Sequence, residues 1–460
     1  MSISAVVLAA GKARRMGGVR PKALYKLGGE PLIFHVIREI QKIKGIQLHI
    51  VVGFGGTQVQ EAVSCHFKEL HNIHWHQQAE QLGTAHAVSQ ALPTIANHEQ
   101  VIIAYADMPF INAANYRALL DIQKQHDVVF MSAMLKDPTG YGRILRTDGG
   151  EVARIIEQAD ASVDEYKIKE VNLGIMASQS QTLNKLIKEI KNDNKQHEYY
   201  LTDCIQLAVN NNLKIGTCEL PETWRASGIN TLAQYTVAER LLQRARVSEL
   251  IARGAIVRDT NRLDVRGKVQ LGQDVVFDVG VVLEGEIELG DRVEVGAYSV
   301  LKDASIAADT MVKPFSYIEG AHIGKSCIVG PYARIRPNTR IGDDNRIGNF
   351  VEIKETTTGA YTKVNHLSYI GDSDIGSQVN IGAGTITCNY DGAQKHRTRI
   401  GDDVFVGSDT QIVAPVEISS KATIGAGSTI TRDVPADKLT LSRCQQTTVT
   451  GWKRPSKKSK

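Results

Sequence analysis

Short apolar runs alternate with amphipathic segments over the first half of the chain. Runs at 5–10, 48–53, 101–107 and 127–135 are rich in Val and Ile, as buried parallel strands are. Segments such as 34–43 and 83–92, between the runs, carry apolar residues at helical spacing. This alternation predicts an open α/β sheet, in which ligands bind beyond the carboxyl ends of the strands. We therefore expect the loop after Leu8 and the side chain of Asp107 to lie at one crevice.

Apolar residues recur at every sixth position over much of the second half, a period that no helix has. The series run from Leu271 to Leu301, from Ile323 to Ile353 and from Ile400 to Ile430, and many members are followed by Gly. Three flat faces of six residues make one coil of a parallel β-helix. The stretch "GAGTITCNYDGAQKHRTR" between Ile381 and Ile400 is too long for one face, so we expect it to project as a functional loop.

One amphipathic helix is predicted between these halves, over about 231–253. Its apolar residues have a spacing of three to four, and Gly254 ends it. The expected domains are a nucleotidyltransferase-like domain at 1–229, a linker helix at 230–252, a β-helix at 253–443 and a basic tail at 444–460.

Charge and length exclude several classes of protein. The 460 residues, 42% of them apolar, suffice for two domains with real cores. The net charge of +4 becomes −1 without the five cations of residues 451–460, so the body carries no excess of cations for nucleic-acid binding. We interpret the tail as a solvated end.

The cysteine pattern and the N-terminus favour a cytoplasmic protein. The six cysteines have neither zinc-site nor disulfide-framework spacing, which predicts free thiols in a reducing compartment. The first apolar run is only about eight residues long and precedes its charges, unlike a signal peptide. No stretch approaches the roughly 18 apolar residues that a membrane span needs.

Three clusters in the first half carry candidate chemistry, each with an ordinary alternative. The segment 8–22, "LAAGKARRMGGVRPK", offers backbone N–H groups and cations to a triphosphate, or is a solvated basic loop; it is neither a Walker A loop nor a GxGxxG motif. Asp107 is a candidate Mg²⁺ ligand or a turn residue. The segment "QQAEQLGTAHA" offers Gln side chains to a base edge, or is a loop that begins a helix.

The β-helix carries a second set of candidates. Arg336 and Lys354 suit a sugar phosphate, although each cation alone fits a solvated face. His366 lies near Asn365 and Tyr369, and histidine is a natural general base near neutral pH, although a lone histidine is more often structural.

The order of the motifs points to a known family. The segments "LAAGKARRM", "RPK", "QAEQLGTAHA", "YAD", "PTGYGRI", "IIEQADA", "VNLGI" and "EYYLTD" resemble sugar-1-phosphate nucleotidylyltransferases. With "ARIRP", "VEIKE", "VNHLSYIGD", "IGAGTITCNYDG", "GSDTQIVAP" and "AGSTITRDV", residues 3–454 resemble the bacterial bifunctional N-acetylglucosamine-1-phosphate uridylyltransferase/glucosamine-1-phosphate N-acetyltransferase family. This resemblance implies an N-terminal Rossmann-like α/β domain, a long helix and a C-terminal left-handed parallel β-helix.

The resemblance also implies two activities in the synthesis of UDP-N-acetylglucosamine. Acetyl-CoA would acetylate glucosamine 1-phosphate, and UTP with Mg²⁺ would then convert N-acetylglucosamine 1-phosphate to UDP-N-acetylglucosamine and pyrophosphate. The family forms homotrimers, so we expect a homotrimer without nucleic-acid or membrane partners. One alternative is a single-activity nucleotidylyltransferase with a structural or regulatory β-helix, and another is a scaffold or sensor with a decayed nucleotide pocket.

By resemblance, the first site has catalytic, nucleotide, metal and sugar residues. Arg15 and Lys22 would hold the phosphates, and Asp107 and Asn230 would bind Mg²⁺. The nucleotide would contact Leu8, Ala9, Ala10, Gly11, Lys22, Gln78, Gln81, Gly83 and Thr84. The sugar would contact Gly142, Glu157, Asn172 and Asn230.

The second site follows in the same way. His366 would deprotonate the amine of glucosamine 1-phosphate, so Cys388 need not be a nucleophile. The sugar phosphate would contact Arg336, Lys354, Tyr369, Asn380 and Lys395. Acetyl-CoA would contact Ala383, Asn389, Tyr390, Ser408, Ala426 and Arg443.

The sequence departs from the family's pattern in the first half. The usual Gly and Thr of the opening loop are replaced by Ala13 and Arg14. Ala106 and Ala85 replace glycines, and Leu173 replaces a Thr. Alanine matters wherever the backbone needs a positive φ or a close approach, so these changes bear on the first activity rather than on the fold.

Overall fold

The computed structural model describes residues 2–455, and the chain divides into two compact units between Leu242 and Gln243. The sheet of the first unit has the strand order β11-β7-β10-β6-β1-β4-β5, with β8 and β9 as a hairpin on β10. The bounds are β1 (Ile3–Ala9), β4 (Ile46–Val52), β5 (Ile73–Gln77), β6 (Gln100–Tyr105), β7 (Val128–Met134), β8 (Gly142–Arg146), β9 (Val152–Ile156), β10 (Glu170–Gln179) and β11 (Ile215–Glu219).

Strands β1, β4, β5 and β6 are parallel, as predicted, and correspond in part to the apolar runs. β10 runs antiparallel to both of its neighbours, β6 and β7. A small hairpin of β2 (Lys26–Leu27) and β3 (Glu30–Pro31) follows the opening loop.

Helices cover both faces of this sheet, because the strand residues alternate between two apolar clusters. Ala5 and Val7 of β1 belong to one cluster, and Val6 and Leu8 belong to the other. The helices are α1 (Leu32–Gln41), α2 (Gly56–His66), α3 (Thr84–Ala91), α4 (Ala113–Gln123), α5 (Ser180–Glu189) and α6 (Asp203–Asn210). The 3-10 turns are η1 (Arg14–Met16), η2 (Lys22–Leu24), η3 (Leu92–Thr94), η4 (Glu165–Lys167) and η5 (Thr223–Ala226).

Helix α7 (Leu232–Ala252) lies where the sequence predicts the long helix. Tyr235, Ala238 and Leu241 belong to an apolar cluster of the first unit. Val247 and Leu250 belong to the core of the second unit. The two parts of the helix thus pack through different residues, and the apolar residues do not form one continuous face as the sequence predicts.

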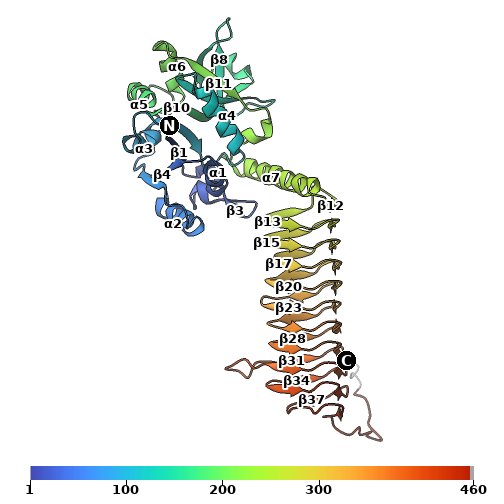
Figure 1. Ribbon diagram of the computed structural model, residues 1–460. Coiled ribbons are helices and arrows are strands. Elements are labelled where there is room, and N and C mark those ends of the chain that lie inside the picture. The colour runs from blue at the N-terminus through green and yellow to red at the C-terminus, as the bar shows by residue number, and fades with distance from the viewer. Residues whose placement is uncertain (1, 456–460) are drawn as a thin grey trace, which may run out of the picture. The chain divides into compact units, whose positions relative to one another are not determined.

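The second unit is a left-handed parallel β-helix with three faces, seen in Figure 1 as a regular stack of coils. The first face holds β12 (Ile256–Val257), β14 (Val276–Phe277), β16 (Glu294–Val295), β18 (Met311–Val312), β21 (Ile328–Val329), β24 (Arg346–Asn349), β27 (Lys363–His366), β30 (Asn380–Ile381), β33 (Phe405–Val406), β36 (Thr423–Ile424) and β38 (Leu439–Thr440).

The other two faces share one folded sheet. Strands β13 (Asp264–Leu271), β15 (Val282–Leu289) and β17 (Val300–Ile306) span the corner between them. The second face continues as β19 (Tyr317–Glu319), β22 (Arg334–Ile335), β25 (Glu352–Lys354), β28 (Tyr369–Gly371), β31 (Ile386–Cys388), β34 (Gln411–Val413) and β37 (Thr429–Ile430). The third face continues as β20 (Ala321–Ile323), β23 (Thr339–Ile341), β26 (Thr357–Thr358), β29 (Ser373–Ile375), β32 (Thr398–Ile400) and β35 (Val416–Ile418).

The six-residue periodicity marks the interior of this β-helix. All members of the three apolar series are buried in one continuous core except Leu271, which is partly buried against it. The predicted projecting loop starts too early, because β31 pairs with β28 and β34 inside the stack. The segment that leaves the stack follows β31 and contains an antiparallel bridge between Tyr390 and Lys395; it projects beside β31 in Figure 1.

Two further expectations can be compared with the described residues. All six cysteines are free, and no helix within 2–455 has the length and apolar character needed to cross a bilayer. The last five residues of the predicted basic tail, 456–460, lie outside the described residues.

Candidate functional site

A cavity of about 390 Å³ opens at the carboxyl ends of β1 and β6. The two strands end together, since Leu8 pairs with Tyr105 and the Ala106 N–H donates to the Leu8 carbonyl at 3.0 Å. The cavity is lined by every residue assigned to the nucleotide or the metal, namely Leu8, Ala9, Ala10, Gly11, Arg15, Lys22, Gln78, Gln81, Gly83, Thr84, Asp107 and Asn230.

The opening loop turns back on itself before it reaches Lys22. Gly17 and Gly18 both have positive φ, and the Gly18 N–H donates to the Ala13 carbonyl at 2.9 Å. The Tyr25 hydroxyl donates to the Met16 carbonyl at 2.8 Å. These contacts return the chain to the strand edge, so that η2 presents Lys22 to the cavity.

Lys22 joins the two predicted metal ligands. Its ammonium forms an ion pair with the Asp107 carboxylate and donates to Asn230 Oδ1 at 2.6 Å. A carboxylate and an amide oxygen thus converge on one cation, and such oxygens are the ligands that Mg²⁺ prefers. Among the described residues no cluster of three or more His, Cys, Asp or Glu could hold a metal ion.

Gly83 allows its own segment and the segment around Tyr199 to pack closely in the wall of the cavity. A Cβ at this position would lie 2.5 Å from the Tyr199 carbonyl oxygen, and the glycine has a φ of +118°. The buried Gln78 side chain donates to the Gly83 carbonyl at 3.1 Å, and Thr84 Oγ1 accepts the Leu201 N–H at 3.0 Å. Any side chain here would push the two segments apart and open the cavity wall.

The predicted sugar residues Gly142, Glu157 and Asn172 lie together beside this cavity. Gly142 pairs with Asn172 across β8 and β10, and a Cβ on Gly142 would lie 3.5 Å from the Glu157 carboxylate. Thr202 Oγ1 donates to Glu157 Oε1 at 3.0 Å. Burial raises the pKa of Glu157, and nearby Asp203 and Asp160 raise it further, while Thr202 and Arg143 oppose the change.

Tyr105 lies between the predicted sugar residues and the cavity. It lines the cavity, and a Cβ on Gly174 would lie 2.8 Å from its ring. Burial, together with the charges of Glu157 and Asp107, raises the pKa of this phenol. The hydroxyl therefore stays protonated, and it is hydrogen-bonded to Thr84.

The departures from the family's pattern fit without backbone strain. Ala13 has a φ of −70° and is buried in an apolar cluster with Met16 and Leu27. Ala85, Ala106 and Leu173 are also buried, and none of them has a positive φ. The glycines that Ala13, Ala85 and Ala106 replace are therefore not required by the backbone conformation of this chain.

His366 ends β27 at the corner between the first and second faces of the β-helix. It pairs with Asn349 on β24, and its Nδ1 lies 3.0 Å from Asn349 Oδ1. The ring is exposed. With Nδ1 bound as the donor, Nε2 is the basic nitrogen that faces outward.

Four of the six residues assigned to acetyl-CoA, namely Ala383, Ser408, Ala426 and Arg443, continue along this corner, whereas Asn389 and Tyr390 follow β31 at the other edge of the second face. The Gly384 N–H donates to the His366 carbonyl at 3.4 Å, the Asp409 N–H to the Ala383 carbonyl at 2.7 Å, and the Gly427 N–H to the Ser408 carbonyl at 2.8 Å. Arg443 Nη1 then donates to the Ala426 carbonyl at 3.0 Å. The three backbone steps from His366 to Ala426 span roughly 14 Å, and Arg443 follows on the next coil, so a long, narrow ligand could run along this corner.

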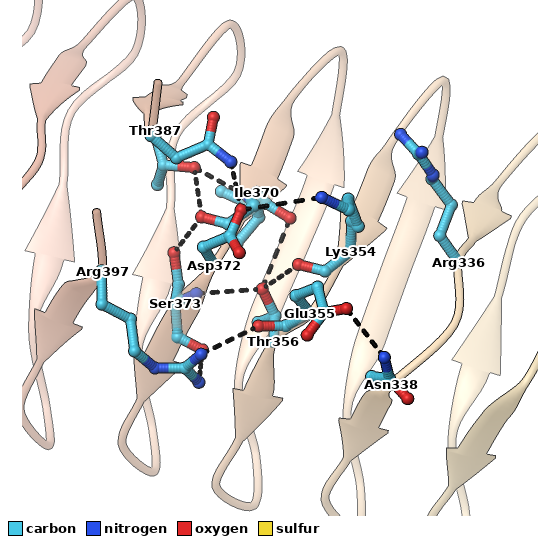
Figure 2. A network of polar contacts seen from close by, with 12 residues as sticks. Arg336, Asn338, Lys354, Glu355, Thr356, Ile370, Asp372, Ser373, Thr387 and Arg397 are labelled. Atoms are coloured by element: carbon cyan, nitrogen blue, oxygen red, sulfur yellow. Dashed lines mark hydrogen bonds and ion pairs between the residues drawn. The ribbon is translucent and has the colours of Figure 1, made fainter. Parts of the chain in front are cut away.

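The opposite edge of the second face collects cations around one carboxylate (Figure 2). Lys354 Nζ lies 3.9 Å from Asp372 Oδ2, and Asn389 Nδ2 donates to the same oxygen. Arg336 Nη1 donates to Glu352 Oε1 at 2.8 Å one coil away. The neighbouring Lys395 ammonium and burial lower the pKa of Lys354, as expected where like charges gather to receive an anion.

Tyr369 lies across the strand between the two edges. Its hydroxyl accepts a hydrogen bond from Asn389 Nδ2 at 3.4 Å. A Cβ on Gly371 would lie 2.5 Å from the Tyr369 hydroxyl and 2.8 Å from Asn389 Nδ2. Gly371 therefore makes room for both side chains on the outer surface of β28.

The structure does not bring every predicted residue of this second site together within one chain. Asn380 lies on the first face beside Lys363, whereas Lys354 and Tyr369 lie on the second. The Tyr390 side chain is exposed, and its hydroxyl donates to the Gly392 carbonyl at 2.6 Å. Cys388 is partly exposed, and burial raises the pKa of its thiol, as expected for an unreactive cysteine.

The sequence analysis missed several polar partners in both sites. Asp372, Glu352 and Asn349 contact predicted residues, and Tyr105 and Glu198 line the nucleotide cavity. Four of these five lie within quoted motifs, such as "YAD" and "EYYLTD", so the signal was present although no role was attached to it.

Two protein-family models match the chain. The MobA-like NTP transferase domain matches residues 5–162. The bacterial transferase hexapeptide model, with six repeats, matches residues 320–355 and 397–432.

Curated relatives match over the whole length. The Bifunctional protein GlmU of Nitrosospira multiformis is 46% identical over 459 residues, covering 100% of this chain and 99% of the relative. Those of Aromatoleum aromaticum and Cupriavidus pinatubonensis are 45% and 44% identical, covering 98% and 99% of this chain and the same shares of the relatives.

Proposed function

The chain belongs to the family of bifunctional GlmU proteins, and on that premise we propose which residues carry each of the two reactions. It is a bifunctional transferase of UDP-N-acetylglucosamine synthesis, with acetyltransferase and uridylyltransferase activities. The reading with one activity and a merely structural β-helix does not hold, because relatives that match over the full length are bifunctional.

We assign acetyl transfer to the β-helix, with His366 as the general base. The outward Nε2 accepts the proton as the amine of glucosamine 1-phosphate attacks the thioester carbonyl of acetyl-CoA. The bond from Nδ1 to Asn349 Oδ1 supports this role because it fixes the tautomer. Lys354, Lys395 and Arg336 hold the sugar phosphate, and Tyr369 lies between this phosphate and the reacting amine.

The corner that runs from His366 to Arg443 receives acetyl-CoA. Ala383, Ser408 and Ala426 are small residues on successive coils, so a pantetheine chain can lie close to the backbone. Arg443 is placed for the phosphates at the far end, as guanidinium groups bind phosphate in a forked geometry. Asn389 and Tyr390 close the site from the projecting loop.

We assign uridylyl transfer to the cavity of the first unit. The phosphate of N-acetylglucosamine 1-phosphate attacks the α-phosphorus of UTP, and pyrophosphate leaves. Such a transfer needs positioning and charge neutralisation rather than a nucleophilic side chain, which Arg15 and Lys22 supply. Gln78, Gln81, Gly83 and Thr84 bind the uridine, while Gly142, Glu157 and Asn172 hold the sugar.

Asp107 and Asn230 are the proposed ligands of Mg²⁺, which the convergence of their oxygens on Lys22 supports. When bound there, the ion would neutralise charge on the phosphates. Lys22 then has to leave the two oxygens and pair with a phosphate instead.

The remaining expectations are part of the same proposal. The uridylyltransferase domain is assigned to 1–229, the linker to 230–252 and the acetyltransferase domain to 253–443. The enzyme is proposed to be cytoplasmic. We propose a homotrimer, because Asn380 and the cations occupy different faces of one chain, so that neighbouring chains would complete the site. Sedimentation analysis of the full chain tests this, and an active monomer would contradict it.

The observation that supports this division of labour is that the residues predicted for the first reaction line one cavity in the first unit, whereas those predicted for the second lie in the second unit. The decisive experiment measures both reactions on the wild-type chain and on two variants. His366→Ala should lose acetyl transfer by about 10² to 10⁴-fold and keep uridylyl transfer. Asp107→Asn should show the reverse pattern, and loss of both activities in either variant would contradict the assignment.

A further inference from the structure

We propose that Asp372 is a positioning residue of the acetyl-transfer site, which holds Lys354 and Asn389 in the arrangement that receives the sugar phosphate. This inference rests on the proposed function of that site. It concerns a residue to which neither the family's motifs nor the sequence analysis gave a role.

The backbone of Asp372 is hydrogen-bonded to the coils on both sides of its own. It follows β28 in a left-handed turn, with a φ of +49°. Its N–H donates to the Lys354 carbonyl at 3.0 Å, and its own carbonyl accepts the Thr398 N–H at 3.0 Å. The carboxylate thus stands on a backbone that is fixed to the coils on both sides.

One oxygen of this carboxylate serves two partners of the site. Asn389 Nδ2 donates to Asp372 Oδ2, and Lys354 Nζ lies 3.9 Å from that same oxygen. Figure 2 shows Lys354 pointing toward Asp372, with Arg336 one coil further along. At 3.9 Å the lysine is attracted but makes no hydrogen bond, so its N–H groups stay available to a phosphate.

Charge explains why a carboxylate belongs in an anion site. Lys395 and Arg336 both face Lys354 and lower its pKa, as does burial, whereas Asp372 raises it. Glu355 and Tyr369 face Lys395 from the neighbouring strands. Without Asp372, Lys354 would be repelled by two cations and would lose its proton more readily.

A second aspartate shows what an ordinary corner residue does. Asp303 has the same left-handed backbone, with a φ of +46°, at the same corner several coils away. Its carboxylate accepts the Glu286 N–H at 3.0 Å, which is a local backbone contact. The Asp372 carboxylate instead contacts two side chains of the proposed site, from β25 and from the projecting loop.

The test compares Asp372→Asn with Asp303→Asn in the full-length chain. Asparagine also tolerates the left-handed turn, so both variants should fold. We expect Asp372→Asn to lower kcat/KM for glucosamine 1-phosphate by about 10- to 100-fold, mainly through KM, with KM for acetyl-CoA within about twofold of the wild type. Asp303→Asn should match the wild type in both.

The pH profile separates positioning from general damage. Because Asp372 raises the pKa of Lys354, its loss should move the alkaline limb of kcat/KM for glucosamine 1-phosphate to lower pH. A defect of folding alone would reduce activity without moving this limb. Asp303→Asn should leave the limb in place.

The outcomes distinguish this inference from the proposed function. A wild-type chain that does not acetylate glucosamine 1-phosphate would contradict the function itself. If the wild type acetylates and Asp372→Asn behaves like Asp303→Asn, or binds the sugar phosphate more tightly, the positioning role is wrong. If Asp372→Asn does not fold, Asn389→Ser removes the same contact from the projecting loop, and an unchanged KM for glucosamine 1-phosphate in that variant would overturn the proposal.

Discussion

The ammonium of Lys22 pairs with the carboxylate of Asp107, 85 positions away, and donates a further hydrogen bond of 2.6 Å to Asn230 Oδ1. A lysine therefore stands where the two proposed metal ligands meet. If Asp107 and Asn230 bind a divalent cation as proposed, Lys22 would compete with the ion for the same oxygens, and binding of one would displace the other.

This competition predicts opposite effects on metal binding and on catalysis. In Lys22→Met, Mn²⁺ should bind the nucleotide-free protein about fivefold more tightly, because a competing cation is gone. Uridylyl transfer should nevertheless fall by about 10² to 10³-fold, because a phosphate loses its ammonium partner. Titration calorimetry with Mn²⁺ and a pyrophosphate-release assay measure the two effects.

The exposed Lys26, four residues along the chain, offers the matched control. Lys26→Met should change neither the affinity for Mn²⁺ nor the rate. Weaker binding of Mn²⁺ to Lys22→Met would show that Lys22 supports the metal site rather than competing with the ion.

Gly371 gives a prediction for the second site. In Gly371→Ala the new Cβ would meet the Tyr369 hydroxyl at 2.5 Å and Asn389 Nδ2 at 2.8 Å, so both side chains have to move. We expect acetyl transfer to fall by about 10²-fold, as for a displacement of about 1 Å in a preorganised site. Uridylyl transfer, measured on the same preparation, should be unchanged.

A glycine in open space serves as the comparison for this variant. The nearest atom to a Cβ on Gly149 is Thr147 Oγ1 at 3.7 Å, which is ordinary contact. Gly149→Ala should leave both activities unchanged. Full acetyl transfer by Gly371→Ala would mean that Tyr369 and Asn389 do not need their present positions.

Ala13 tests whether the altered opening loop impairs the first reaction. The residue has a negative φ and is buried beside Met16 and Leu27, so the chain uses its methyl group for packing. Restoring the family's glycine in Ala13→Gly should cost about 1 kcal/mol of stability, through lost burial and greater freedom of the unfolded chain.

The rate of uridylyl transfer should change less than about threefold in Ala13→Gly, because the backbone conformation does not require glycine. Thermal unfolding and pyrophosphate release with UTP measure the two quantities. A large gain in rate would show that the methyl group obstructs the nucleotide.

The periodic parts of the fold could be predicted because burial imposes a period on the sequence. Two-residue alternation places Val6 and Val7 in different cores, and six-residue recurrence places Ile335 and Ile353 inside the β-helix. β10 could not be predicted as antiparallel, because a strand buried on both faces has the same pattern in either direction.

The candidate site was predictable only where a motif carried it. Lys22, Asp107 and His366 stand in segments that resemble those of a known family. Asp372 lies in the quoted segment "VNHLSYIGD", but it sits at a β-helix corner that other coils fill with Asp303 or Glu355, so its position alone gave it no role. The contacts of its carboxylate with Lys354 and with Asn389, which follows β31, distinguish it from the other corner residues.

The histidines of β4 and β5 predict an acid-sensitive first unit. His49 is buried, its Nδ1 lies 3.0 Å from His76 Nε2, and the rings of His74 and His76 stack on it at 4.7 and 5.2 Å. Burial lowers the pKa of His49 to about 4, and the two neighbouring histidines add to the effect. Ser4 and Thr94 hydroxyls lie 3.4 Å from its ring nitrogens, and Ser4 also donates to Glu99.

The direction of the pH dependence follows from when His49 takes up a proton in each state. In the unfolded chain His49 takes up a proton near pH 6.5, whereas in the folded unit it takes up a proton only near pH 4. The free energy of unfolding should therefore fall as the pH falls through this window, by roughly 3 kcal/mol at most, and the dependence should end below it.

His49→Gln should remove most of this loss, because glutamine does not titrate. Denaturant unfolding at several pH values, followed by hydrogen exchange in β4 and β5, measures it, with the exposed His98→Gln as the control. A slope that persists unchanged in His49→Gln would place the acid sensitivity elsewhere in the unit.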